Sequence, residues 1–143
     1  MSYLSSSSSR PLRRSSDARV IALAEDDPAL RELIAAALAL DGHRVLQLGN
    51  GSALMTSVHK ILIQGGALDL LISDVRMPGL SGLDALKLLR ESQLRIPVIL
   101  ITAFSDLWTR TEATRYGARL LDKPLELHVL RKVVSDSLTG RDN

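Results

Sequence analysis

The chain has 143 residues, the length of one ordinary domain, and 45% of them are hydrophobic, which is enough to build a buried core. It has no cysteine, which excludes disulfides and thiolate metal sites, and its three histidines form no close pair that would favour zinc. No apolar run approaches the roughly 20 residues that a membrane span needs, so we expect a soluble, cytoplasmic protein.

The formal net charge of +2 belongs to the N-terminal segment. Residues 1–18 carry Arg10, Arg13 and Arg14 against Asp17, which leaves 15 basic and 15 acidic residues in the rest of the chain. This neutral remainder argues against a nucleic-acid-binding chain, which would show a basic face. Because the segment is rich in serine and arginine and poor in apolar residues, we predict a disordered tail, with a nucleic-acid or partner arm as the alternative.

Apolar patterns and capping residues predict five strand–helix repeats. In the first repeat, the apolar run Val20–Ala24 is followed by Asp27, a helix cap, and by Pro28, which favours the first turn of a helix. An apolar stripe with helical spacing follows, and Gly42 ends the helix. The remaining predicted segments are strands His43–Leu48, Leu68–Ser73, Pro97–Ile101 and Leu120–Leu121, and helices Ser52–Ile63, Gly82–Glu91, Asp106–Tyr116 and Leu125–Leu138.

This alternation of strands and helices is typical of a doubly wound parallel sheet, here of five strands flanked by five helices. The third strand contains an apolar run, Leu70–Ile72, which suits burial on both faces of such a sheet. We therefore predict one α/β domain over residues 19–138 and a short C-terminal tail over 139–143.

Charged and polar residues stand where the predicted strands end. Glu25 and Asp26 follow the first strand, Asp74 follows the third, Thr102 the fourth and Lys123 the fifth. The carboxyl ends of parallel strands line one crevice in an open sheet, so we expect these side chains to converge. Crowded carboxylates repel one another unless a cation joins them, and oxygen ligands suit Mg²⁺.

The lysine and the threonine indicate what else this crevice holds. A metal site alone needs neither, but an anion with several oxygens beside the metal would use Lys123 as a point charge and Thr102 as a donor. A phosphoryl group fits that description. Asp74 precedes a turn, Met77–Gly79, that leaves it exposed for attack, and aspartate is able to carry an acyl phosphate.

These residues resemble the receiver domains of bacterial two-component response regulators, over about residues 19–138. The matching stretches are Leu23–Pro28, Leu71–Gly79 with Ser81–Leu83, Ile101–Ala103 and Asp122–Pro124. The resemblance implies a flavodoxin-like fold with strand order 2-1-3-4-5. It also implies that Asp74 is the phosphoacceptor, that Thr102 contacts a phosphoryl oxygen, and that Lys123 pairs first with Asp74 and then with the phosphate.

The resemblance further implies a Mg²⁺ site made by Glu25, Asp26, Asp74 and the main-chain carbonyl of Arg76. Simpler interpretations exist for single residues. Asp27 is better explained as a helix cap than as another metal ligand, because it directly precedes Pro28. Taken alone, Thr102 would be a strand end, Asp74 a turn residue and Lys123 a surface lysine.

The chain departs from the family pattern near its fifth strand. Many receivers have a tyrosine or phenylalanine three residues before the lysine, where this chain has Leu120, and Leu125 replaces a common phenylalanine. The phosphorylation chemistry is then intact while its readout is altered. A candidate partner surface contains Trp108, Arg110, Arg115 and Leu120, since an aromatic beside arginines is a frequent anchor. The alternative is that Trp108 covers the edge of the core.

Three functions fit these observations. The first is a signalling domain that takes a phosphoryl group from a histidine kinase or phosphotransfer protein, hydrolyses it slowly and switches binding to a downstream protein, without being a turnover enzyme. The second is a phosphorylation-independent interaction module. The third is a Mg²⁺-dependent phosphatase, which Arg76 disfavours because it stands where a second acid would be needed. The sequence ends soon after its last helix, so we expect a single-domain regulator or a fragment of a longer one.

Overall fold

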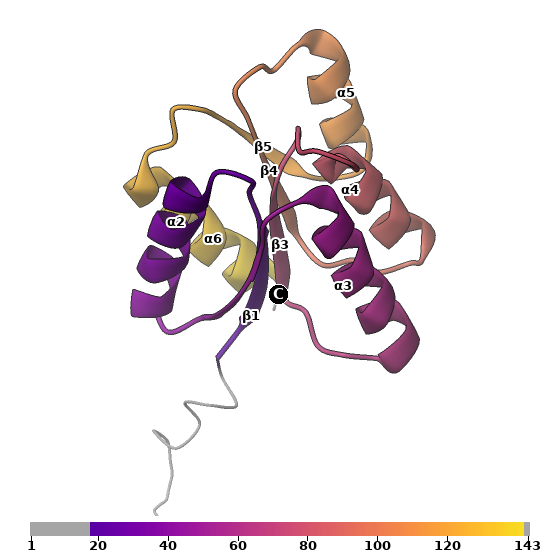
Figure 1. Ribbon diagram of the computed structural model, residues 1–143, viewed down its shortest axis with the longest axis horizontal. Coiled ribbons are helices and arrows are strands. Elements are labelled where there is room, and N and C mark those ends of the chain that lie inside the picture. Colours follow the sequence, from indigo (N-terminus) through magenta and orange to yellow (C-terminus); the bar gives the residue numbers. More distant parts are fainter. Residues whose placement is uncertain (1–17, 142–143) are drawn as a thin grey trace, which may run out of the picture.

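The computed structural model describes residues 18–141, in which five parallel strands form one sheet in the order β2-β1-β3-β4-β5 (Figure 1). This order confirms the prediction. The predicted N-terminal tail falls, except for Ala18, outside the described residues. Along the chain the elements are β1 (Val20–Ala24), α2 (Pro28–Leu40), β2 (Arg44–Leu48), α3 (Gly51–Gln64), β3 (Leu70–Asp74), α4 (Gly82–Glu91), β4 (Val98–Thr102), α5 (Leu107–Arg115), β5 (Arg119–Asp122) and α6 (Leu127–Arg141).

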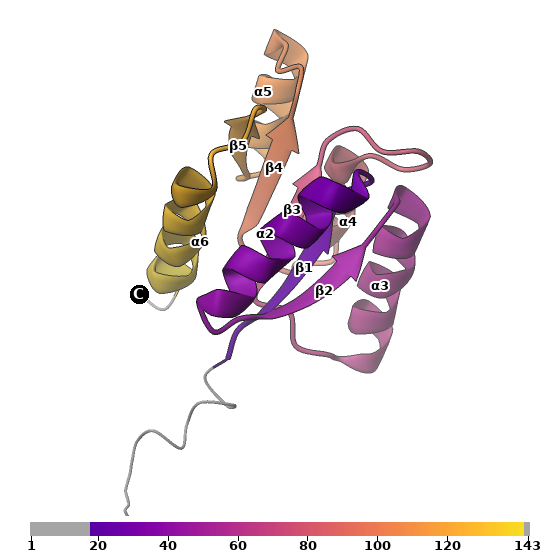
Figure 2. The same cartoon turned by 60° about the vertical axis from the view of Figure 1, so that its left-hand side comes forward.

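Helices cover both faces of the sheet and form two separate cores. Figure 2 shows α2 and α6 on one side of the strands and α3 and α4 on the other. Alternate strand residues point to opposite faces, so Ile72 packs with α2 and α6, whereas Leu71 packs with α3, α4 and α5. Every residue of β3 and of β4 is buried, as expected for central strands of a parallel sheet.

Strands β3, β4 and β5 each end one residue later than predicted, and in β3 and β4 this places a polar site residue within the sheet. Asp74 is the last residue of β3, where it pairs in register with Ile101. Thr102 is the last residue of β4 and pairs with Asp122. The backbone of both residues therefore belongs to the sheet and not to the loops that follow it.

Capping explains most helix starts. Asp27 accepts hydrogen bonds from the backbone N–H groups of Ala29 and Leu30, at 3.0 and 3.4 Å, which confirms its predicted role as the cap of α2. Ser81 and Asp84 form a reciprocal capping box at the start of α4.

The last helix differs from the prediction at both ends. It begins at Leu127 and not at Leu125, because the carbonyl of Glu126 accepts the first helical hydrogen bonds, from Val129 and Leu130 at 3.1 Å. It continues to Arg141, so part of the predicted tail at 139–143 is helical. The apolar stripe ends at Leu138, but no proline follows to stop the helix there. No helix among residues 18–141 is long and apolar enough to cross a bilayer.

At Gly51, the start of α3 packs closely against the loop after β3. A Cβ atom at this position would lie 2.5 Å from the backbone nitrogen of Leu80, whereas a Cβ at Gly140 in α6 would contact nothing within 4 Å. We predict that Gly51→Ala lowers the free energy of unfolding by about 1–3 kcal/mol through overpacking. Gly140→Ala should raise it by a few tenths of a kcal/mol, up to about 1, because alanine favours helix. Urea unfolding measures the free energy of unfolding of both variants. Equal changes in the two variants would contradict close packing at Gly51.

Candidate functional site

The polar residues that end the strands meet at the carboxyl edge of the sheet. Glu25 follows β1, Asp74 and Thr102 end β3 and β4, and Lys123 follows β5. Since β1, β3, β4 and β5 are consecutive neighbours in the sheet, residues separated by almost one hundred positions lie in one crevice.

Three carboxylates crowd this crevice. One oxygen from each of Glu25, Asp26 and Asp74 lies within 4.8 Å of the other two. Glu25 and Asp74 are only 1% and 5% exposed, whereas Asp26 is exposed. Like charges at this separation and depth repel strongly unless positive charge lies among them.

Glu25 is held by the start of α2. Its Oε2 atom accepts a hydrogen bond from the backbone N–H of Asp27 at 3.0 Å, and Arg31 donates to its main-chain carbonyl at 2.9 Å. Burial raises the pKa of Glu25, the hydrogen bond from Asp27 lowers it, and the charge of Asp74 raises it again. The net direction is upward, as expected for a carboxylate that lacks enough positive charge.

Lys123 supplies the positive charge that is present. Its Nζ atom donates a hydrogen bond to Asp74 Oδ2 at 2.8 Å and forms an ion pair with Glu25 Oε1 at 3.1 Å. Burial lowers the pKa of Lys123, but the bonds and charges of the two carboxylates outweigh it and raise the pKa above its ordinary value. The ammonium therefore stays charged between them.

One oxygen in the crevice has no hydrogen-bond donor within the part of the chain that the structure describes. Glu25 Oε1 is buried, and its contact with Lys123 is an ion pair without hydrogen-bond geometry. Buried polar atoms are normally satisfied, so an unsatisfied carboxylate oxygen facing two other carboxylates indicates room for a cation. Oxygen-only donors favour a hard cation such as Mg²⁺.

Asp74 is fixed through both oxygens. Its Oδ2 accepts from Lys123, and its Oδ1 accepts from the backbone N–H of Arg76 at 3.1 Å. The Arg76 guanidinium lies 5.3 Å from the ring centre of Phe104, within cation–π range. This contact joins the loop after β3 to the loop after β4 at the mouth of the crevice. The sequence did not identify Phe104 as a site residue, although it is the only phenylalanine and lies two residues after Thr102.

The Thr102 hydroxyl points into its own loop and not toward Asp74. It donates to the carbonyl of Phe104 at 3.1 Å and accepts from the backbone N–H of Phe104 at 3.0 Å. Thr102 is 1% exposed. To contact a group on Asp74, this hydroxyl must first release the Phe104 backbone.

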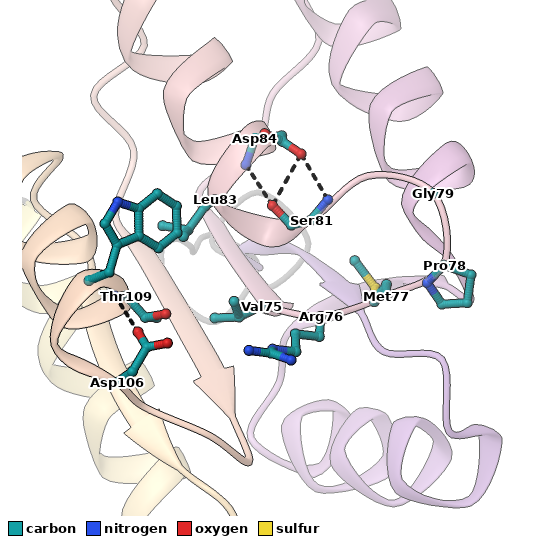
Figure 3. Close-up of a pocket in the computed structure, with 11 residues that line it drawn as sticks. Val75, Arg76, Met77, Pro78, Gly79, Ser81, Leu83, Asp84, Asp106 and Thr109 are labelled. Atoms are coloured by element: carbon teal, nitrogen blue, oxygen red, sulfur yellow. Dashed lines mark hydrogen bonds between the residues drawn. The ribbon is translucent and has the colours of Figure 1, made fainter.

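A cavity of about 600 Å³ lies beside the crevice, between the loop after β3 and the starts of α4 and α5 (Figure 3). Arg76, Met77 and Pro78 line it from the loop. Thr109 lines it from α5, and Asp106 lines it from the position just before that helix. The Asp106 carboxylate caps α5 by accepting from the N–H of Thr109 at 2.7 Å. Movement of either loop would therefore reshape this cavity.

The residues of the predicted partner surface differ in exposure and in their contacts. Trp108 is 60% exposed at the start of α5, which argues against its covering the core edge. Arg110 pairs with Asp122 at 3.4 Å, and Arg115 pairs with Glu112 at 3.7 Å. Leu120 is half-buried and packs against the core on the α3–α4 side of the sheet. The surface of α5 thus presents Trp108 and the arginines, while Leu120 belongs to the sheet.

Comparison with known proteins identifies the family. The protein-family model described as "Response regulator receiver domain" matches residues 21–135 of this chain. The chain is 35% identical over 122 residues to the response regulator protein FleR of Pseudomonas aeruginosa, covering 85% of this chain and 25% of that protein. It is 36% identical over 124 residues to the DNA-binding transcriptional regulator NtrC of Azospirillum brasilense, covering 86% and 25%. The chain therefore spans about a quarter of the length of these relatives.

Solved structures show the same fold. A receiver domain protein (CheY-like) from Methanospirillum hungatei aligns with a TM-score of 0.78 at 18% identity, over 88% of this chain and 98% of that one. The receiver domain of the Francisella response regulator 1452 aligns with a TM-score of 0.74 at 25% identity, over 87% and 99%.

The ion pairs of Lys123 can be tested without any ligand. In metal-free buffer, Lys123→Gln should lower the free energy of unfolding by about 1–3 kcal/mol, because it leaves Asp74 and Glu25 without a counter-charge in a largely buried crevice. Adding Asp74→Asn should recover part of this loss, because one of the repelling charges is then removed.

Lys132→Gln is the matched control, since Lys132 forms a mostly exposed pair with Asp136 on α6. It should change stability by less than about 0.5 kcal/mol. Urea unfolding of the wild type and of these three variants gives the four free energies of unfolding. A Lys123→Gln protein as stable as the control would show that the crevice carboxylates do not depend on this lysine.

Proposed function

This chain belongs to the receiver domains of response regulators, and we propose that Asp74 is the residue on which it accepts a phosphoryl group. The observation that carries the proposal is the geometry of the Asp74 carboxylate. It stands at the end of a buried strand, is held through both oxygens, and has Lys123 at 2.8 Å and two further carboxylates beside it.

The proposed reaction is transfer of a phosphoryl group from a phosphohistidine of a kinase or phosphotransfer protein. A carboxylate oxygen of Asp74 attacks phosphorus, and the P–N bond breaks with its electron pair going to the histidine nitrogen. The other ring nitrogen of the phosphohistidine carries a proton and keeps it. The product is an acyl phosphate on Asp74 and a neutral imidazole. Positioning and charge stabilisation supply nearly all the catalysis in such transfers, and the chain's residues are suited to both.

We propose that Glu25, Asp26, Asp74 and the main-chain carbonyl of Arg76 hold Mg²⁺. The unsatisfied Glu25 oxygen and the three clustered carboxylates support this assignment. When bound, the ion neutralises charge that develops on the phosphoryl oxygens. Asp26, the exposed member, is placed to accept the ion from solvent, while Glu25 is fixed in position by its bond from Asp27.

Lys123 and Thr102 are proposed to bind the transferred group. The Lys123 ammonium already forms an ion pair with the Asp74 carboxylate, which is the attacking group. A small shift would let it pair with a phosphoryl oxygen. Thr102 would exchange its two bonds with the Phe104 backbone for one to the phosphoryl group. That exchange frees the loop leading to α5, where Trp108 is exposed, and so links the charge on Asp74 to a partner surface.

The chain is then a signalling domain and not a turnover enzyme, acting in the cytoplasm, where donors derived from ATP are present. We infer that a water slowly hydrolyses the acyl phosphate and that a protein target reads the altered α5 surface. The alternative is an interaction module that works without phosphorylation. Leu120 favours it, because this half-buried leucine replaces the aromatic that many receivers move during switching.

Phosphorylation itself separates these two functions. Incubation with Mg²⁺ and acetyl phosphate should add one phosphoryl group to the wild-type chain, measured by intact mass. Asp74→Asn should abolish the gain while leaving the fold unchanged, because the substitution is nearly isosteric. Asp136→Asn, an exposed aspartate on α6, should be phosphorylated normally. No mass gain in wild type with acetyl phosphate or with a phosphorylated histidine donor would favour the interaction module.

Adjacent aspartates provide a matched test of the metal ligands. Asp26→Asn should weaken Mg²⁺ binding by about tenfold or more in calorimetric titrations, because it removes a charged oxygen ligand. Asp27→Asn should change the affinity by less than about twofold, since asparagine caps a helix as well as aspartate does. Equal weakening by both substitutions would indicate a general effect of negative charge and would overturn the assignment of Asp26.

A further inference from the structure

We propose that the chain has a second ligand site, an arginine-lined pocket that binds a small multivalent phosphate such as pyrophosphate or the phosphates of a nucleotide. The pocket has a volume of about 540 Å³ and is lined by Arg90, Arg95, Thr114, Arg115, Tyr116 and Gly117. The proposal is independent of the function assigned to Asp74.

The arginine pocket lies at the end of the sheet opposite the crevice. Arg95 comes shortly before β4 and Gly117 shortly before β5, so the pocket adjoins the amino ends of these strands, whereas Thr102 is at the carboxyl end of β4. Helices α4 and α5 are neighbours here (Figure 1), linked by the hydrogen bond from Arg90 Nε to the carbonyl of Tyr116 at 2.8 Å.

Arg90 lines the pocket and is held in place by three backbone carbonyls. Besides the Tyr116 carbonyl, its guanidinium donates through Nη1 to the carbonyls of Leu94 and Ile96, at 3.0 and 2.9 Å. These acceptors are neutral, and Arg90 forms no ion pair with any carboxylate in the described part of the chain. Burial lowers the pKa of Arg90, and the charge of Arg95 lowers it further. The Nη2 group makes no hydrogen bond to another residue between 18 and 141.

The pocket carries an excess of positive charge. Arg95 is exposed and has no ion pair among residues 18–141. Arg115 lies 3.7 Å from Glu112, but this carboxylate also pairs with Lys87 at 3.4 Å. The carboxyl ends of α4 and α5 contribute about half a negative charge each, which offsets roughly one of the arginine charges. No acidic residue lines the pocket.

Size and geometry favour a phosphate-bearing ligand. The volume lies in the range typical of small-molecule pockets. The exposed guanidinium groups of Arg95 and Arg115 present planar pairs of donors that match phosphate oxygens. Arg90 offers its Nη2 group, and Thr114 adds a hydroxyl. Because the arginines come from three different segments, one monovalent anion would engage only part of them, whereas linked phosphates reach several.

Calorimetry with pyrophosphate in EDTA tests this site, since chelation of divalent cations keeps the Asp74 crevice from contributing a metal-bound phosphate site. We expect one saturable site per chain. Arg95→Gln and Arg115→Gln should each weaken binding by about tenfold, the usual effect of losing a charged hydrogen bond. Both side chains are exposed, so the variants should fold normally, which circular dichroism checks. Arg44→Gln, at an exposed position on β2, is the charge-matched control and should bind normally.

The outcomes are decisive in either direction. Binding that survives Asp74→Asn and is lost in the Arg95 and Arg115 variants supports the pocket. If ATP binds more tightly than pyrophosphate, the pocket also recognises the nucleoside. If the two bind equally, the pocket recognises only the phosphates. Absence of saturable binding, or equal weakening by Arg44→Gln, would overturn the proposal, because the attraction would then be one of general charge.

Discussion

Repulsion among three carboxylates at one edge of a parallel sheet is the constraint on which this molecule depends. One oxygen from each of Glu25, Asp26 and Asp74 lies within 4.8 Å of the other two, and within residues 18–141 their ion pairs come from Lys123 alone. With all four groups ionised, two negative charges remain, which is the charge that a divalent cation neutralises. The fold tolerates this crowding because strand ends and the cap of α2 hold the groups in place. We propose that this crowding of charge makes the crevice a site for a cation and a phosphoryl group.

The same edge offers a route from the site to the surface. Thr102 and Arg76 follow or end the two central strands, and each contacts Phe104, the first through the backbone and the second through the ring. A group added to Asp74 therefore competes for partners that now hold the loop before α5. Leu120 packs into the sheet and contacts the core, so the route we infer runs through this loop and does not need an aromatic at position 120.

The sequence predicted the fold and the members of the crevice because both depend on local patterns. Continuous apolar runs mark buried strands, and Asp27 before Pro28 marks a helix start, so the strand ends fall where the polar residues stand. The direction of the Thr102 hydroxyl and the Arg76–Phe104 contact could not be predicted, because they depend on how two loops meet. The same holds for Arg90, whose acceptors include a carbonyl 26 positions away. The extension of α6 to Arg141 was missed because its last turn has no apolar stripe.

We propose above that Asp74 carries the phosphoryl group as an acyl phosphate. Borohydride reduction of the phosphorylated chain, followed by peptide mass spectrometry, tests it most directly, since reduction converts an aspartyl phosphate to homoserine and leaves free aspartate unchanged. We expect homoserine at position 74 and at no other position. Homoserine at another aspartate, or phosphate that resists borohydride on a serine or threonine, would contradict it.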